Sequence, residues 1–202
     1  MELVLATRNP HKLREVARML APHGLSVRPL PEGVTLPPED GESFEANALT
    51  KARAAAAALG MPVIADDSGI EAQALGGRPG VRSARYAGEQ ATDAQNLAKL
   101  LAEAPAGSGL LYVCALAYVR PAPEAGGAAE EQLFRGECSG RLAPVPSGLH
   151  GFGYDPAFIP DEQPGQLTMA QLSDAQKDAI SHRGRALLAL ARWLRQASDS
   201  AS

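Results

Sequence analysis

Apolar and polar residues follow one another along the chain in blocks that predict strands followed by helices. The first apolar run, residues 3–6, predicts a buried strand, and the helix after it has Asn9 as its N-cap and Pro10 at its first position. Apolar residues then recur at helical spacing and form one apolar face, and the predicted helix ends near Gly24. The chain therefore opens with a strand, a tight loop and an amphipathic helix.

The same alternation continues through the rest of the chain. Further helices are predicted after Ser43, Thr92, Ser173 and Ser181, and further strands at residues 62–65, 110–119 and 132–138. We expect the strand at 62–65 to end at Asp66, and residues 121–131 to form an exposed loop. Helices that alternate with strands indicate an α/β fold whose sheet is at least partly parallel.

Composition places the chain among globular proteins, because 45% of its 202 residues are hydrophobic and 21% are charged. We expect one domain over residues 1–197 and a flexible tail over residues 198–202. The net charge of −4, without a basic block, argues against nucleic acid as a partner. The N-terminus lacks the features of a signal peptide and no apolar stretch is long enough to span a bilayer, so we expect a cytoplasmic protein without membrane contact.

Three polar residues, Thr7, Asn9 and Lys12, lie where the first strand gives way to the first helix. Free backbone N–H groups and the positive end of a helix favour an anion such as phosphate there, and Lys12 adds a full charge. A capped helix with a solvated lysine would use the same residues. On these residues alone the capped helix is the simpler interpretation, because the Gly-rich pattern of a P-loop is missing.

Asp66 and Asp67 follow directly on an apolar strand, and open α/β sheets bind ligands where strands end. Mg²⁺ typically takes one or two carboxylates and completes its shell with substrate phosphates and water. Adjacent acids point to opposite sides, so we expect at most one of them to face a given metal. In the alternative interpretation both acids cap a turn before Gly69.

Two later segments combine aromatic, acidic and basic side chains. Residues 151–156, Gly-Phe-Gly-Tyr-Asp-Pro, could stack a purine and accept a hydrogen bond from its edge, and a plain aromatic turn fits the same pattern. Residues 181–183, Ser-His-Arg, could bind an oxygen-rich ligand or simply cap the last helix. The sequence contains no GxSxG, HExxH or GxGxxG motif, so serine hydrolases, zinc proteases and dinucleotide-dependent enzymes lack support.

Taken in order, these segments resemble the inosine/xanthosine triphosphate pyrophosphatase family over nearly the whole chain. The resemblance is carried by residues 5–12, 39–44, 65–69, 75–86 and 151–156, by Lys177 and by residues 181–183. It implies a Mg²⁺-dependent hydrolase that converts ITP, dITP and XTP to the monophosphate and pyrophosphate. It also implies a homodimer and an elongated, two-lobed mixed sheet flanked by helices, with the nucleotide in a cleft between the lobes.

The resemblance assigns roles to individual residues. Asp67 would be the proton acceptor, and Glu39 and Asp67 would hold the metal. The substrate contacts would be Thr7, Arg8, Asn9, Pro10, His11, Lys12, Ser68, Phe152, Gly153, Tyr154, Asp155, Lys177, His182 and Arg183. A donor such as His182 or Arg183, aimed at the 6-oxo edge of the base, would favour hypoxanthine and xanthine over adenine, which presents an amino group there.

Three positions depart from the family's pattern. Arg8 stands where a small residue is common, Ala46 replaces a glutamate, and Leu149-His150 stands where Thr-Gly is commoner. Arg8 would either add a phosphate contact or point to solvent. Two rival functions stay open: a pyrophosphatase that acts on modified pyrimidine triphosphates, and a nucleotide sensor without catalysis.

Overall fold

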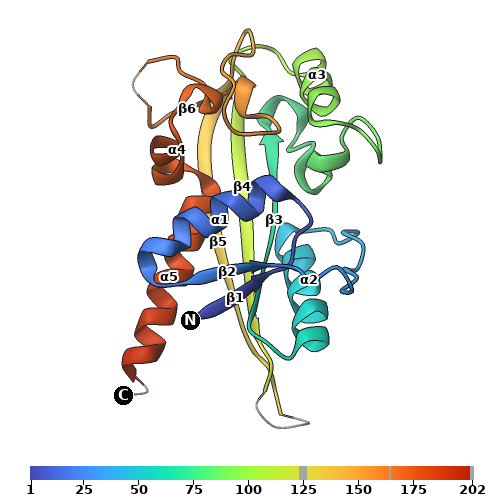
Figure 1. Ribbon diagram of the computed structural model, residues 1–202. Helices are drawn as coiled ribbons and strands as arrows, with labels where there is room; N and C mark the ends of the chain where they lie inside the picture. Colours follow the sequence, from blue (N-terminus) through green and yellow to red (C-terminus); the bar gives the residue numbers. More distant parts are fainter. Residues whose placement is uncertain (123–126, 164, 201–202) are drawn as a thin grey trace. The chain divides into compact units, whose positions relative to one another are not determined.

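The computed structural model describes residues 1–122, 127–163 and 165–200, and the chain divides into two compact units (Figure 1). Unit 1 comprises Met1–Asp67, Cys114–Arg135 and Arg183–Ser202. Unit 2 comprises Ser68–Val113 and Gly136–His182. The chain therefore passes from one unit to the other several times, and each unit is built from segments that are distant in sequence.

The strands form a mixed sheet in the order β2-β1-β3-β4-β5-β6. They are β1 (Glu2–Leu5), β2 (Ser26–Pro29), β3 (Val63–Ala72), β4 (Gly109–Arg120), β5 (Glu130–Leu142) and β6 (Phe158–Pro160). β1 pairs in parallel with both β2 and β3, whereas β5 and β6 are antiparallel. The predicted mixed α/β sheet is confirmed, although the short strands β2 and β6 were not predicted.

The helices are α1 (Pro10–Leu20), α2 (Phe44–Leu59), α3 (Asp93–Glu103), α4 (Asp174–Ile180) and α5 (His182–Ser200). Their starts agree with the predicted caps: the side chains of Asn9, Ser43, Thr92 and Ser173 each accept a hydrogen bond from a backbone N–H group of the first turn. Within the described residues, none of the helices combines the length and the hydrophobicity that a membrane span requires.

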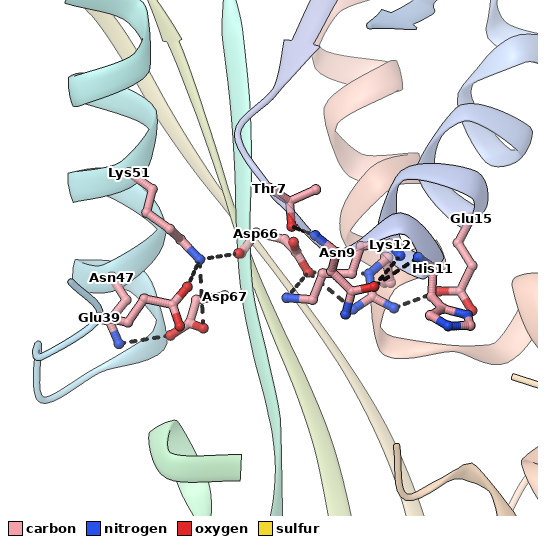
Figure 2. Close-up of polar contacts among 11 residues, drawn as sticks. Thr7, Asn9, His11, Lys12, Glu15, Glu39, Asn47, Lys51, Asp66 and Asp67 are labelled. Carbon is pink, nitrogen blue, oxygen red and sulfur yellow. Dashed lines mark hydrogen bonds and ion pairs between the residues drawn. The ribbon is translucent and has the colours of Figure 1, made fainter. Parts of the chain in front are cut away.

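The core of unit 1 packs α1 and α5 against the strands. Val16 and Leu20 of α1 join Leu187 and Leu190 of α5 in one cluster of buried side chains, which also contains Leu5 of β1. Helix α2, which buries several alanines, lies on the other side of β3 from α1 (Figure 2). The strands of this unit are therefore covered by helices on both faces, as expected for α/β proteins.

Unit 2 has a second core of its own. Ile70 of β3 and Tyr112 of β4 pack there with Leu100 of α3 and Phe158 of β6, and Leu172 closes the same cluster. Each of these side chains is buried. Both units therefore contain a separate apolar cluster that holds the ends of the long strands in place.

The prediction that Asp66 ends the third strand is wrong. β3 continues through Asp66 and Asp67 as far as Ala72, and Ile70 and Ala72 are fully buried. Both aspartates lie inside the strand because other side chains of the fold pair with them, and Gly69 belongs to the strand instead of a turn. Part of the predicted loop at 121–131, residues 123–126, lies outside the described residues.

Candidate active site

The two aspartates of β3 point to opposite sides of the strand, as their adjacent positions predict (Figure 2). Asp66 faces the side of α1, where Lys12 lies, and Asp67 faces the side of α2, where Asn47 and Lys51 lie. The two carboxylates consequently have separate sets of partners. Both sets belong to unit 1.

Asp66 is the centre of a buried network of charges. Its Oδ2 atom lies 3.0 Å from Nζ of Lys12 and accepts hydrogen bonds from Nη2 and Nε of Arg183 at 3.1 and 3.3 Å. Nη1 of Arg183 donates to Glu15 at 2.7 Å. Burial alone would raise the pKa of Asp66, but Lys12 and Arg183 outweigh it and hold the pKa below its ordinary value. Asp66 is therefore favoured in its charged form, and it holds the ammonium of Lys12 beside the start of α1.

Asp67 lies among polar groups that α2 supplies. Nδ2 of Asn47 donates to Oδ2 of Asp67 at 2.9 Å, and Nζ of Lys51 lies 4.0 Å from Oδ1. The same ammonium donates to the backbone oxygen of Asp66 at 2.7 Å and contacts the carboxylate of Glu39. Burial raises the pKa of Asp67, and the charge of Glu39 adds to this effect, while Lys51 opposes it. A carboxylate with a raised pKa is a stronger base than an ordinary aspartate.

Asn47 also positions the loop that carries Glu39. Its Oδ1 atom accepts a hydrogen bond from the backbone N–H of Gly41 at 2.8 Å. A Cβ atom at Gly41 would lie only 2.6 Å from that oxygen, so a glycine is required for this close approach. One amide side chain thus holds both Asp67 and the loop beside it.

Lys51 was not predicted, although the sequence carries a signal for it. Asn47 and Lys51 lie one turn apart on the face of α2 that otherwise buries Phe44 and alanines. A polar residue within an apolar helical stripe must find a partner in the interior. The helical pattern does not say which partner, because the carboxylates that meet Lys51 come from a strand and a loop elsewhere in the chain.

The loop between β1 and α1 has the geometry of a capped helix start. Oδ1 of Asn9 accepts from the N–H groups of His11 and Lys12 at 2.8 and 3.3 Å, and Oγ1 of Thr7 accepts from the N–H of Asn9 at 3.2 Å. Pro10 is the first residue of α1. The predicted cap is confirmed, and a role of this loop in binding phosphate stays a prediction.

Arg8 has a role that the sequence did not suggest. Its guanidinium donates to four backbone carbonyls of one loop, those of Leu30, Pro31, Glu32 and Val34, at distances of 2.7 to 3.3 Å. Carbonyl groups in a loop lack partners unless a side chain or water supplies them. Arg8 therefore ties residues 30–34 to the loop between β1 and α1, and a contact between Arg8 and substrate stays a prediction.

The substitution Arg8→Ala is expected to loosen the segment 30–34. Without the guanidinium the segment loses four hydrogen bonds from Arg8 and keeps the backbone bond from Val34 to Pro31, so we expect its amide hydrogens to exchange about tenfold faster in hydrogen–deuterium exchange mass spectrometry. Arg28→Ala is the matched control, because Arg28 forms only an exposed ion pair with Glu2 among the contacts described. Unchanged exchange in Arg8→Ala would contradict this positioning role.

Unit 2 gathers a second set of predicted residues around the buried carboxylate of Asp155. Its Oδ2 atom accepts from the backbone N–H of Phe152 at 2.9 Å and from Nζ of Lys177 at 2.6 Å. The ammonium of Lys177 lies 5.2 Å from the centre of the Phe152 ring. A Cβ atom at Gly151, where φ is +72°, would lie 2.0 Å from Oδ2 of Asp155, so this turn requires glycine.

Four other predicted residues, Ser68, Gly153, Tyr154 and His182, also belong to unit 2. The hydroxyl of the buried Tyr154 donates to the backbone oxygen of Ser83 at 2.8 Å, and the N–H of Gly153 donates to Asp93 at 3.0 Å. His182 is buried and its ring stacks on that of Tyr112. Ser68 lies in β3, directly after Asp67.

The carboxylates of unit 1 can be tested against the requirements of a metal ion. Among the residues that the structure describes, no group of three or more His, Cys, Asp and Glu side chains could hold a metal. Asp67 and Glu39 nevertheless offer two hard oxygen donors on either side of one ammonium. This set fits Mg²⁺, which needs few protein ligands when phosphates and water complete its shell, and does not fit a metal held by protein alone.

Fold and sites together define an α/β protein with a carboxylate–ammonium centre suited to a polyanionic ligand. The chain belongs to the Ham1 family: the sequence model of that family matches residues 3–193. It is 46% identical to a dITP/XTP pyrophosphatase from Frankia alni over 99% of this chain and 100% of that protein. It is 47% identical to a dITP/XTP pyrophosphatase from Erwinia tasmaniensis over 92% of this chain and 90% of that protein.

Solved structures agree with this assignment. A HAM1 protein from Coxiella burnetii has a TM-score of 0.83 and 37% identity, covering 97% of this chain and 99% of that one. The Ham1 protein of Staphylococcus aureus has a TM-score of 0.81 and 38% identity over the same shares. The family and the mixed-sheet fold expected from the sequence are both confirmed.

Proposed function

We propose that this protein is a Mg²⁺-dependent nucleoside-triphosphate pyrophosphatase that hydrolyses ITP, dITP and XTP to the monophosphate and pyrophosphate. The observation that carries the proposal is the buried Asp67, whose raised pKa and whose partners Asn47, Lys51 and Glu39 suit a base beside a polyanion. The names of the relatives from Frankia alni and Erwinia tasmaniensis support the substrate class. A homodimer, from the family resemblance, and a cytoplasmic location, from the sequence analysis, complete the proposal.

In the proposed reaction, water attacks the α-phosphorus. A bond forms between the water oxygen and that phosphorus, the bond to the bridging oxygen of the β-phosphate breaks, and pyrophosphate leaves with the electron pair. Asp67 accepts the proton of the attacking water and orients its oxygen. Lys12, at the positive end of α1, binds triphosphate oxygens, while Lys51 neutralises charge next to Asp67.

Glu39 and Asp67 would hold Mg²⁺, which when bound supplies a Lewis acid that stabilises charge on phosphate oxygens. Lys51 keeps these two carboxylates from repelling each other before the metal arrives. Asn47 holds Asp67 and the loop of Glu39 in a fixed arrangement. The chain's own side chains therefore hold both carboxylates in place.

Recognition of the base is assigned to unit 2. Phe152 offers a ring for stacking, Asp155 accepts hydrogen bonds, and His182 supplies a donor for the 6-oxo group. His182 is the candidate donor that belongs to the same unit as Phe152 and Asp155, whereas Arg183 belongs to unit 1, where its guanidinium binds Asp66 and Glu15. A donor aimed at the 6-oxo group disfavours adenine by about 1 to 3 kcal/mol, since two donors would oppose each other there.

A substrate panel tests the proposal. We expect pyrophosphate release from ITP, dITP and XTP to exceed that from ATP and GTP by about tenfold or more, and to stop when EDTA removes Mg²⁺. Release of inorganic phosphate from the γ-position would contradict the position of cleavage. Preferential hydrolysis of dUTP or methylated pyrimidine triphosphates in the same panel would indicate the pyrimidine-specific alternative. Binding of ITP without any turnover would indicate a sensor.

A further inference from the structure

Tyr112 of β4 contacts two predicted base-binding residues at once, although it belongs to none of the motifs that mark the candidate site in the sequence. Its hydroxyl donates to Oδ1 of Asp155 at 3.1 Å. Its ring is stacked on that of His182, with 4.5 Å between ring centres and 7° between ring planes. All three residues are buried within unit 2.

The hydroxyl of Tyr112 completes the set of donors around Asp155. The other carboxylate oxygen, Oδ2, already accepts from the backbone of Phe152 and from Lys177. With donors on both oxygens, the carboxylate cannot rotate without leaving a buried donor unpaired. Tyr112 therefore fixes the direction in which Asp155 presents its remaining acceptor positions.

The ring of Tyr112 acts on His182 in a different way. An imidazole donates hydrogen bonds in the plane of its ring, so the ring plane decides which ligand atom it can reach. The stacked Tyr112 ring sets that plane, and Phe158 packs against Tyr112 with 4.5 Å between ring centres. The orientation of His182 is thus supported from the core of unit 2.

We propose that Tyr112 is a positioning residue for recognition of the nucleotide base, its hydroxyl orienting Asp155 and its ring orienting His182. The inference rests on the proposed function, since it assigns the base to these two residues. It predicts that the two parts of the Tyr112 side chain contribute separately: the hydroxyl to affinity, and the ring to discrimination between 6-oxo and 6-amino purines.

The hydroxyl is tested with Tyr112→Phe, which keeps the ring. We expect KM for ITP and the dissociation constant of inosine monophosphate, measured by isothermal titration calorimetry, to rise about tenfold while kcat stays within about twofold. Tyr118→Phe is the matched control, because Tyr118 is a buried tyrosine of the same strand that packs on Trp193 in unit 1. This control is expected to leave both constants unchanged.

The ring is tested with Tyr112→Leu. We expect the ratio of kcat/KM for ITP to that for ATP to fall about tenfold below the ratio of Tyr112→Phe. This ratio does not depend on the folded fraction of a preparation, so partial unfolding cannot imitate the result. Both substrates are measured in the same preparation.

Wild-type binding constants and selectivity in Tyr112→Phe and Tyr112→Leu would overturn the proposal, and so would a loss confined to kcat. If the wild type binds inosine monophosphate without hydrolysing ITP, the proposed function fails. The positioning role then stands if Tyr112→Phe still weakens inosine monophosphate binding, and falls if it does not.

Discussion

Replacing Asp67 by Asn is expected to lower kcat for ITP hydrolysis by about a thousandfold while the protein stays folded. The amide cannot accept a proton from water and is a poorer metal ligand than a carboxylate. Its oxygen can still accept the hydrogen bond from Nδ2 of Asn47, and Lys51 keeps Glu39 and the backbone oxygen of Asp66 as partners. Steady-state pyrophosphate release measures the fall in kcat, and thermal unfolding of the same preparation checks that the protein stays folded.

Asp161→Asn serves as the control for this experiment, because Asp161 is an exposed carboxylate whose ion pair with Arg141 lies outside both candidate sites. We expect it to retain wild-type turnover. If Asp67→Asn keeps more than about a tenth of wild-type activity, Asp67 is not the proton acceptor and another group must activate the water.

Arg183→Met is expected to lower the free energy of unfolding by about 3–5 kcal/mol. Arg183 is buried and bridges Asp66 and Glu15, so its removal leaves buried carboxylates without their cation. Methionine fills part of the same volume and therefore separates the loss of charge from the loss of packing. Urea unfolding monitored by circular dichroism measures the change in the free energy of unfolding.

Arg192→Met provides the matched control on the same helix, since Arg192 is exposed. Its effect is expected to stay within about 0.5 kcal/mol. A stable Arg183→Met protein with weakened ITP binding would reverse the interpretation: the arginine would then serve the substrate instead of the buried network.

Local signals in the sequence were sufficient to predict where the helices begin. Asn9, Thr92 and Ser173 cap helices because each side chain bonds to backbone groups two or three residues away, and such contacts depend on the neighbouring residues alone. The alternation of strands and helices predicted an α/β fold with a partly parallel sheet, and the family resemblance added that the sheet is mixed. The family resemblance, which rests on short motifs, also assigned Asp67 and Glu39 to one candidate centre.

Features that depend on contacts between distant segments were not predictable in this way. The strand β3 was cut short because two aspartates look like a turn until their partners are known. The buried partners of Lys51 and Arg183 come from other elements, so the local sequence pattern did not show them. A buried charge is defined by the groups that neutralise it, and those groups are assembled only by the fold.

The placement of two carboxylates on opposite faces of β3 makes the centre sensitive to the register of that strand. Side chains alternate along a strand, so a slip by a single residue would turn each aspartate to the opposite face. A deletion of one residue between Val63 and Asp66 would bring Asp67 to Lys12 and place Ser68, which has no carboxylate, beside Asn47. An insertion there would bring Asp66 to Asn47 and leave Lys12 and Arg183 without their anion, so either change would remove one of the two carboxylates from its partners.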